Sequence, residues 1–527
     1  MRGAYRLRVV LLTALLVPAT GLIAARPPLI EAVRNQDRES VRALLKQGVD
    51  VNEAQPDGAT ALHWSVYQED LEMVDLLLAA RADVNAANDL GVTPLVMACT
   101  SGNGAIVSRL LAAGANPHAA LPGGETALMW AARSGSLQAV SALLAGGAVV
   151  NARERAHGQT ALMWAVANNH SAVTRALVDR GADVAARSET RAAVFLFGAN
   201  RTLSVASPDT IAETRQGGST PLLFAARSGD LESARILVGA GANVNDTAAD
   251  GNTALVIAAH SGHGSVAALL LEEGADANAA PLGYTALHAA VLRGALRERD
   301  VVNTDPGAGV NLIKALLAHG ANPNANSTAG TPVRRGSQDF ILSDRWIGAT
   351  PFWLAARFLE IEMAELLAAA GASPNRPTRD GTTPLMAAAG VGYSRGGGDT
   401  SNIRDRRDLS HYNAVASAFA SRIPDQEEAR ALQTVERIIT WGAEVNAANS
   451  GGDTALHGAS ALGMNTVVRL LAARGANLNA INRAGRTPLN VASRDTGEGR
   501  MRRESTADVL RALGAEDERT PPARRRQ

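Results

Sequence analysis

Histidine and cysteine are the residue types in this sequence that could ligate a transition metal. The chain has ten histidines and a single cysteine, Cys99. His260 and His263 are spaced to share one face of a helix, but Gly262 between them predicts a helix end, and no third ligand is near them in the sequence. One cysteine can form neither an intramolecular disulfide nor a thiolate cage. The sequence therefore predicts no metal site and no disulfide.

Nucleophilic catalysis and nucleotide binding also lack their usual patterns. No serine lies in a Gly-x-Ser-x-Gly motif that follows a predicted strand. The glycines from Gly390 to Gly398 follow a helical pattern and lack the third spaced glycine of a dinucleotide-binding loop. Cys99 falls at a core-like position inside a predicted helix. We therefore expect no enzymatic activity and no cofactor.

The composition excludes two further classes of protein. The 51 Lys and Arg residues balance 51 Asp and Glu residues, which disfavours binding of nucleic acid through bulk charge. Hydrophobic residues make up 46% of the chain, so intrinsic disorder is disfavoured as well. Only 3% of the residues are aromatic, and the core must be built mostly from Leu, Val, Ile and Ala. This composition favours thin layers of helix on helix over one deep globular centre.

The N-terminal segment is typical of a secretory signal peptide. It has three early arginines, an apolar run over residues 9–17, and small residues up to Ala25. A short membrane anchor is the alternative, but Pro18 interrupts the run, which is shorter than the roughly 20 residues of a spanning helix. We expect residues 1–25 to be removed. The mature chain is then expected to be periplasmic or secreted, with no membrane insertion.

One short phrase recurs along almost the whole chain: Gly, any residue, Thr, Pro or Ala, then Leu, with Phe352 replacing Leu once. Most successive copies are 32 to 34 residues apart, which is the signature of a solenoid. The eleven opening glycines are Gly58, Gly91, Gly124, Gly158, Gly218, Gly251, Gly283, Gly348, Gly381, Gly452 and Gly485.

Each copy predicts two short helices. The Thr hydroxyl can cap a first helix, and Pro suits its first turn. A second Gly, or Asn169 in the fourth copy, follows eleven residues after the opening Gly and predicts the end of that helix; it stands at Gly102, Gly135, Gly229, Gly262, Gly294, Gly392 and Gly463. Paired leucines such as Leu110-Leu111 then predict a second helix, which ends at a Gly-Ala pair.

This phrase resembles the ankyrin repeat. The resemblance implies an all-α solenoid of helix-turn-helix units joined by short β-hairpin loops, running from about residue 26 to residue 515. Because a single unit cannot bury its own apolar stripe, stability must come from stacking of neighbours. We assign residues 26–57 to a degenerate N-terminal capping repeat, residues 58–515 to the array, and residues 516–527 to a disordered charged tail.

Three spacings between opening glycines are too long: 60, 65 and 71 residues. They predict insertions at about 189–216, 295–309, 326–347 and 393–426. Degenerate repeats hidden in these gaps are the alternative, although the first gap has no paired leucines. Insertions are where an otherwise generic array could acquire a specific function.

The histidines and tryptophans that recur at fixed repeat positions are predicted to be structural. The resemblance implies that His63, His288 and His457 hydrogen-bond within the Thr network of their repeats. Trp64, Trp130 and Trp164 share a position where the pattern expects an apolar core residue. For Trp346, at the end of an insertion, contact with a partner and packing onto its own loop remain open.

The resemblance further implies that partners bind to the hairpin tips and to a concave face made by the first helices. We therefore expect a non-catalytic scaffold, a monomer, that binds a protein and not nucleic acid. A structural or glycan-binding protein of the cell envelope, or a stabiliser of an exported enzyme, is the alternative. The insertion at 326–347, with the following helix, is expected to lead recognition, with a loop that merely covers the stack as the alternative. The candidate partner-binding residues are Tyr67, Gln68, Arg133, Asn168, Arg227, Asp250, His260, Tyr284, Arg293, Arg334, Arg335, Phe340, Trp346, Arg357 and Phe358.

Overall fold

The computed structural model describes residues 27–196, 211–280, 282–295, 308–328, 346–392, 425–493 and 500–516. The chain forms two compact units, here called the first unit (Met1–Asp183) and the second unit (Val184–Gln527). The expected signal peptide at 1–25 lies outside the described residues, as do most of the insertions at 295–309, 326–347 and 393–426 and nearly all of the tail from 516.

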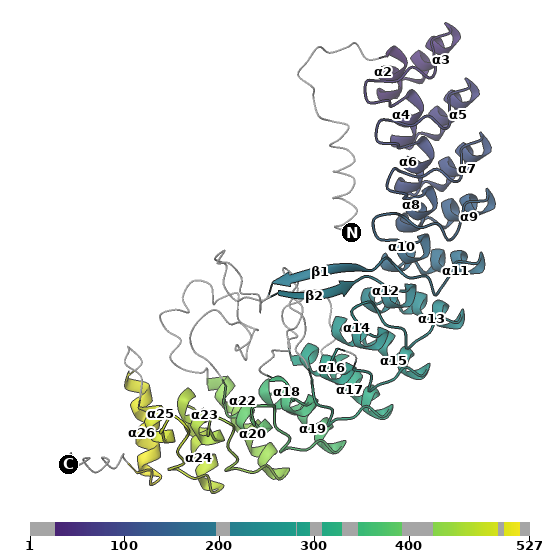
Figure 1. Ribbon diagram of the computed structural model, residues 1–527. Coiled ribbons are helices and arrows are strands. Elements are labelled where there is room, and N and C mark those ends of the chain that lie inside the picture. Colours follow the sequence, from purple (N-terminus) through teal and green to yellow (C-terminus); the bar gives the residue numbers. More distant parts are fainter. Residues whose placement is uncertain are drawn as a thin grey trace. The chain divides into compact units, whose positions relative to one another are not determined.

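In each unit the described helices come in consecutive antiparallel pairs (Figure 1), with the first helices side by side in one layer and the second helices in another. The helices of the first unit are α2 (Pro28–Arg34), α3 (Arg38–Lys46), α4 (Ala61–Tyr67), α5 (Leu71–Ala79), α6 (Pro94–Ser101), α7 (Gly104–Ala112), α8 (Ala127–Ser134), α9 (Leu137–Ala145), α10 (Ala161–Ala167) and α11 (Ser171–Asp179).

The second unit begins with a hairpin of two antiparallel strands, in which Arg191 pairs with Gln216 and Leu196 with Ile211. The strands therefore occupy the insertion predicted at 189–216. The elements of this unit are β1 (Arg191–Leu196), β2 (Ile211–Gln216), α12 (Pro221–Ser228), α13 (Leu231–Gly239), α14 (Ala254–Ser261), α15 (Gly264–Glu272), α16 (Ala286–Ala295), α17 (Ala308–Ala318), α18 (Pro351–Arg357), α19 (Ile361–Ala369), α20 (Pro384–Ala388), α22 (Asp425–Thr440), α23 (Ala455–Leu462), α24 (Asn465–Ala473), α25 (Pro488–Ala492) and α26 (Arg500–Ala512).

The recurring phrase starts and ends the first helices as predicted. In α6, the hydroxyl of Thr93 accepts a hydrogen bond from the amide of Val96 at 3.3 Å, and Pro94 is the first helical residue. Gly102 ends the helix with φ of 78°, in the left-handed region that a glycine adopts without strain. Gly135, Gly229, Gly262 and Gly463 end their helices in the same way.

Two predicted helix ends are wrong. Gly294 lies inside α16, and α20 stops at Ala388, four residues before Gly392. A Cβ atom on Gly294 would overlap the Cε of Met363 and lie 3.9 Å from the Cα of Gly309, and a Cβ atom on Gly309 would lie 3.2 Å from the Cα of Gly294. Glycine at this position therefore allows α16 to pack closely against α17 and α19, rather than ending the helix.

The recurring histidines link each repeat to the next. The amide of Thr60 donates to Nδ1 of His63 at 3.1 Å, and Nε2 of His63 bonds to the carbonyl of Val92 in the following repeat at 3.0 Å. Because Nδ1 accepts, the proton resides on Nε2 and is donated to that carbonyl. His288 and His457 make the same bonds, so the structural role expected for these three residues is confirmed.

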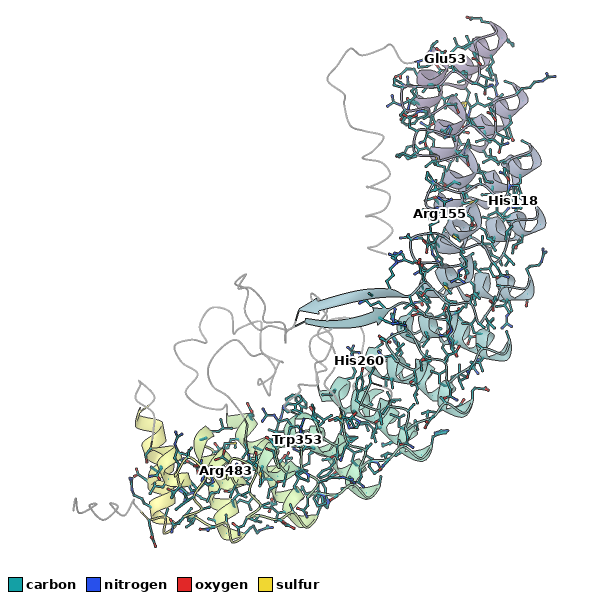
Figure 2. All side chains as sticks on the ribbon, viewed as in Figure 1. Glu53, His118, Arg155, His260, Trp353 and Arg483 are labelled. Atoms are coloured by element: carbon teal, nitrogen blue, oxygen red, sulfur yellow. The ribbon has the colours of Figure 1, made fainter. Side chains whose placement is uncertain are left out.

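An asparagine ladder joins the loops that follow the second helices of consecutive repeats. Nδ2 of Asn278 donates to the carbonyl of Gly320 at 2.9 Å, and Oδ1 accepts from the amide of Asn322 at 2.7 Å. His118 stands at the corresponding place in the second repeat (Figure 2). The same pair of bonds is made by Asn85, Asn151, Asn245, Asn324, Asn375 and Asn446.

The core consists of aliphatic side chains between the two helix layers. Leucines of both helices in a pair, such as Leu95 and Leu110, are completely buried. Burying one such side chain stabilises the fold by about 2 kcal/mol relative to leaving it exposed. Leu255 is 1% exposed, as expected for a core position between repeats. No helix among the described residues has the length and apolarity to cross a bilayer.

Candidate functional site

The first helices of the first unit present a row of large side chains, which we call the first-helix face. Its members stand six, nine or ten residues after the opening glycine of each repeat, so they project from the same side of each helix. The row at the sixth position is Trp64, Met97, Trp130 and Trp164; the ninth and tenth positions add Tyr67, Gln68, Thr100, Ser101, Arg133, Ser134, Ala167 and Asn168.

The N-terminal end of this face is built around Trp64. The guanidinium of Arg34 lies 4.6 Å above the Trp64 ring, and the ring of Tyr67 meets it edge-on at 5.7 Å. Tyr67 is 39% exposed, so it is one of the few large apolar side chains that reach solvent. A hollow opens beside these rings and is lined by Ala59, His63, Trp64, Tyr67, Asn88 and Met97.

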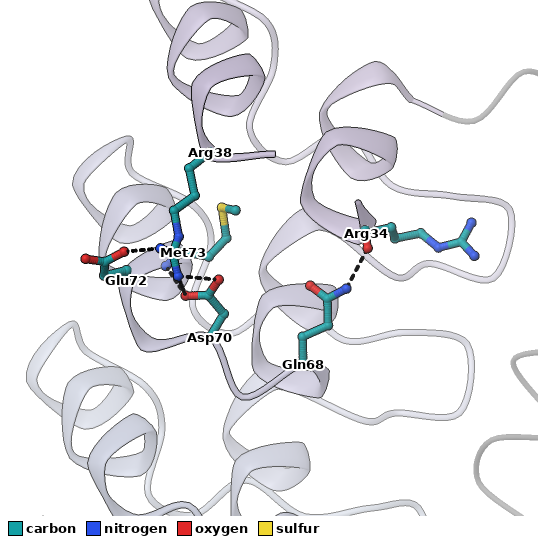
Figure 3. Close-up of polar contacts among 6 residues, drawn as sticks. All are labelled: Arg34, Arg38, Gln68, Asp70, Glu72 and Met73. Atoms are coloured by element: carbon teal, nitrogen blue, oxygen red, sulfur yellow. Dashed lines mark hydrogen bonds and ion pairs between the residues drawn. The ribbon is translucent and has the colours of Figure 1, made fainter. Parts of the chain in front are cut away.

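Gln68 and its neighbours hold α2, α3, α4 and α5 together (Figure 3). Nε2 of Gln68 donates to the carbonyl of Arg34 at 2.7 Å. Arg38 binds both oxygens of Asp70 at 3.0 Å and forms an ion pair with Glu72 at 2.6 Å. Because the amide nitrogen of Gln68 already donates within the fold, it is less available to a binding partner than the sequence prediction assumed.

A second cluster on the face surrounds Arg133. The rings of Trp130 and Trp164, from adjacent repeats, meet edge-on at 5.4 Å, and the Arg133 guanidinium lies 5.6 Å and 5.7 Å from their centroids. Nε2 of His170 bonds to the Arg133 carbonyl at 3.0 Å and so fixes the backbone there. The arginine side chain is half-buried, and among the described residues it has neither a hydrogen-bond acceptor nor a counter-ion.

Asn168 closes the face at its C-terminal end. Its side chain is exposed, and Nδ2 donates to the carbonyl of Trp164 at 2.8 Å. Tyr67, Arg133 and Asn168 are therefore brought to one face by the first unit, as expected for residues of a shared surface.

Four candidates of the second unit reach the surface at least in part. Asp250 accepts hydrogen bonds from the amide and the Nδ2 of Asn252, both at 3.1 Å. Arg227 is exposed, and its carbonyl bonds to Nε2 of His263 at 3.1 Å. Arg293 is half-buried beside Gly262. His260, at the end of α14, is half-buried as well (Figure 2).

Four other candidates are not on the surface, which corrects the expectation that they are accessible. Tyr284 is 5% exposed, and its hydroxyl donates to Oδ1 of Asn252 at 3.4 Å. Trp346 is 8% exposed and packs against Trp353 and Phe358, each at 5.9 Å.

Phe358 is itself 8% exposed, and Arg357 is only 3% exposed and donates to the carbonyl of Val391 at 3.4 Å. Arg357 is buried because the turn after the short helix α20 places the Val391 carbonyl against it, and Phe358 packs on the Trp346 ring. For Trp346 this geometry favours packing within its own repeat over contact with a partner. Arg334, Arg335 and Phe340 lie outside the described residues.

The sequence missed part of the first-helix face. Trp64 and Trp164 were predicted to be core residues, yet both are half-buried and help to form the surface, whereas Trp130 is 9% exposed. Arg34 contributes to the face as well, although it belongs to the N-terminal helix pair, which lacks the opening phrase of the repeat. The sequence did contain a signal of this surface. In the third copy an aromatic residue, Trp130, stands six residues after the opening glycine and an arginine, Arg133, stands nine residues after it.

Three groups with possible chemical reactivity are buried in the core: Cys99, His63 and His288. Burial raises the pKa of the Cys99 thiol well above its usual value, so it is not a ready nucleophile. Burial lowers the pKa of His63, and it lowers that of His288 to about 4. The described residues bring together no group of three or more His, Cys, Asp or Glu side chains that could hold a metal ion.

Models of known protein families match the repeats of this chain. A model described as ankyrin repeats matches residues 29–121, 95–188 and 222–327, which together make up just over half of the chain. A model of a single ankyrin repeat matches residues 451–483. The all-α solenoid expected from the sequence is confirmed by these matches and by the paired helices.

Proposed function

This chain belongs to the ankyrin-repeat family, and from that premise we propose that it is an exported, non-catalytic scaffold that binds a protein partner through the first-helix face of its first unit. Ankyrin repeats generally mediate protein–protein interaction and are typically non-catalytic. The array comprises eleven copies of the repeat phrase and the N-terminal cap.

The observation that carries this proposal is the row of aromatic side chains that stay accessible on the first unit. Trp, Tyr and Arg are the residue types that most often dominate binding energy at protein interfaces. Here Tyr67 is 39% exposed, and Trp64, Trp164 and Arg133 are half-buried. Such a surface retains apolar area that a partner can remove from water.

Export is supported by the sequence of the N-terminus alone. The arginines before residue 9, the apolar run and the small residues up to Ala25 form the pattern that the secretion machinery recognises. Fractionation should find the protein outside the cytoplasm, in the periplasm or medium of a bacterial source, with an N-terminus near Arg26. Full-length chain beginning at Met1 in the cytoplasm would refute this part of the proposal.

Affinity capture tests the binding function. The chain is immobilised and exposed to the extracytoplasmic fraction of its native cells, and retained proteins are identified by mass spectrometry. The same capture is then repeated with Tyr67→Ser and with Leu137→Ser. Leu137 is a matched control because it is 44% exposed but begins α9, a second helix.

We expect Tyr67→Ser to reduce capture of the partner and Leu137→Ser to leave it unchanged. Equal capture by all three chains would show that the first-helix face is not the binding surface. Retention of glycan, with no protein bound, would instead favour the alternative of a glycan-binding envelope protein.

A further inference from the structure

Arg133 is a cation that the fold positions but does not neutralise. Its guanidinium lies over the rings of Trp130 and Trp164 at 5.6 Å and 5.7 Å, which orients the group while leaving its N–H edges unused. Arg34, the other arginine stacked on this face, forms an ion pair with Glu31 at 3.5 Å. Arg133 has no such partner in the part of the chain that the structure describes.

Carboxylates of the first unit do not fill this role. Asp57 accepts hydrogen bonds from Gln55 and from the amide of Ala59 in its own hairpin loop. Glu154 accepts from the amides of His157 and Gln159 in another loop. A half-buried guanidinium with free donors is best matched by a carboxylate, which accepts two parallel N–H bonds. The missing acceptor therefore has the chemistry of an acidic side chain.

The face also offers an apolar anchor at a defined distance from Arg133. The hollow beside Trp64, Tyr67 and Met97 spans the first and second copies of the repeat, and Arg133 lies between the third and fourth. Neighbouring helices pack about 10 Å apart, so the hollow and the guanidinium are separated by about 20 Å. An extended chain covers that distance in about six residues.

We propose that the first-helix face binds an extended acidic segment of a protein partner, with one carboxylate on the Arg133 guanidinium and an apolar side chain, about six residues away, against the exposed Tyr67 ring at the edge of the hollow. This inference rests on the proposed function and names the chemistry of its partner. The direction of the bound segment is not specified by these contacts, so both orders of anchor and carboxylate belong in the test.

The probe is an array of synthetic ten-residue peptides. Each carries one leucine or phenylalanine and one glutamate, separated by two to eight positions in either order, in a background of serine and glycine. Matched peptides replace the glutamate with glutamine or lysine. Binding of the full chain is measured by fluorescence anisotropy at low and high salt, with Arg133→Gln and Arg109→Gln as variants. Arg109 is the control because it is exposed on α7, a second helix, and pairs with Asp75.

We expect glutamate peptides of about six-residue spacing to bind about tenfold more tightly than their glutamine twins, with lysine peptides weakest. High salt should reduce this preference, because it screens the exposed side of the pair. Arg133→Gln should abolish the preference and Arg109→Gln should retain it. Circular dichroism spectra of both variants that match the wild type at the assay temperature show that the loss does not reflect unfolding.

In the peptide assay, three results would overturn the inference: no measurable binding of any glutamate peptide to the wild-type chain, equal binding of glutamate and glutamine peptides, or a preference that survives Arg133→Gln. These outcomes are distinct from failure of the proposed function. If the native partner is lost with Tyr67→Ser but retained by Arg133→Gln, the face binds a protein and the acidic segment is wrong. If capture is indifferent to Tyr67→Ser, the proposed function itself fails.

Discussion

Arg133 in the first unit and Arg357 in the second occupy the same repeat position, nine residues after the opening glycine, and both lie near tryptophans. Arg133 is half-buried and stacks on two rings without a hydrogen-bond acceptor among the described residues. Arg357 is 3% exposed and donates to the carbonyl of Val391. The same residue type at the same position is surface in one unit and core in the other.

The difference arises from the neighbouring repeat. In the first unit the next first helix after α8 is α10, a regular helix that ends at Ala167, and Arg133 stays half-buried beside it. In the second unit α20 ends early, at Ala388, and the chain turns through Gly390, whose φ is 94°, to place Val391 against Arg357. The comparison shows that the length of the next first helix decides whether this position can serve binding.

The largest expected effect is a loss of folding stability that distinguishes Trp353 in the second unit from Trp164 in the first. Trp353 is 2% exposed and its Nε1 donates to the carbonyl of Thr382 at 2.9 Å, so Trp353→Ala should destabilise the protein by about 3–5 kcal/mol. Trp164 is half-buried, and Trp164→Ala should cost about 1–2 kcal/mol. Urea denaturation followed by circular dichroism measures both. Equal losses would mean that the two clusters are equally buried in solution.

The arginines themselves sharpen the comparison. Arg357→Gln should cost about 3 kcal/mol, because it removes a buried charged donor and leaves its acceptors unsatisfied. Arg133→Gln loses only the stacking on the rings of Trp130 and Trp164 and should cost about 1 kcal/mol. The measurement is again the urea midpoint of each variant. A larger loss at Arg133 than at Arg357 would contradict the assignment of surface and core.

The second unit should also be the more sensitive to acid at His288. Burial lowers the pKa of His288 to about 4, whereas an unfolded histidine titrates near 6.5. Stability is complete above pH 6.5 and falls as the pH drops toward 4, because only the unfolded state binds the proton. At pH 4.5 the loss is about 2.5 kcal/mol.

The variant His288→Asn tests this expectation, and the chain itself provides the precedent. In the last repeat Asn490 stands at the histidine position, and its Oδ1 accepts from the amide of Thr487 at 3.0 Å. Urea denaturation of both proteins at pH 7 and pH 4.5 should show a smaller acid-induced loss for the variant. An identical pH dependence would show that His288 does not titrate as its burial requires.

The smallest expected effect belongs to the exposed end of the first-helix face. Tyr67→Ser removes one edge-on ring contact with Trp64 and should cost about 1 kcal/mol or less of stability. The same substitution is expected to have a large effect on partner capture. A substantial drop in melting temperature, with capture unchanged, would reclassify Tyr67 as a structural residue and weaken the contrast between the units.

The sequence by itself determined the repeat, its two helices and the residues that link them. Thr, Pro and Gly at fixed spacings act on the backbone within a few residues, so helix starts such as that at Pro94 and ends such as that at Gly102 follow from local chemistry. The bonds of His63 and His288 follow as well, because each repeat presents the same carbonyl to its neighbour.

Only the tertiary structure decided which recurring positions are exposed. The sequence predicts partner-binding candidates at Trp346, Arg357 and Phe358, but packing buries all three. It predicts core residues at Trp64 and Trp164, but both remain half-buried. Gly294, which reads as a helix end, instead permits a close helix contact. Capping and turn residues act on the backbone within a few residues of themselves. The exposure of a side chain depends instead on which residues of the next repeat pack against it, and insertions change how far away those residues lie in the sequence.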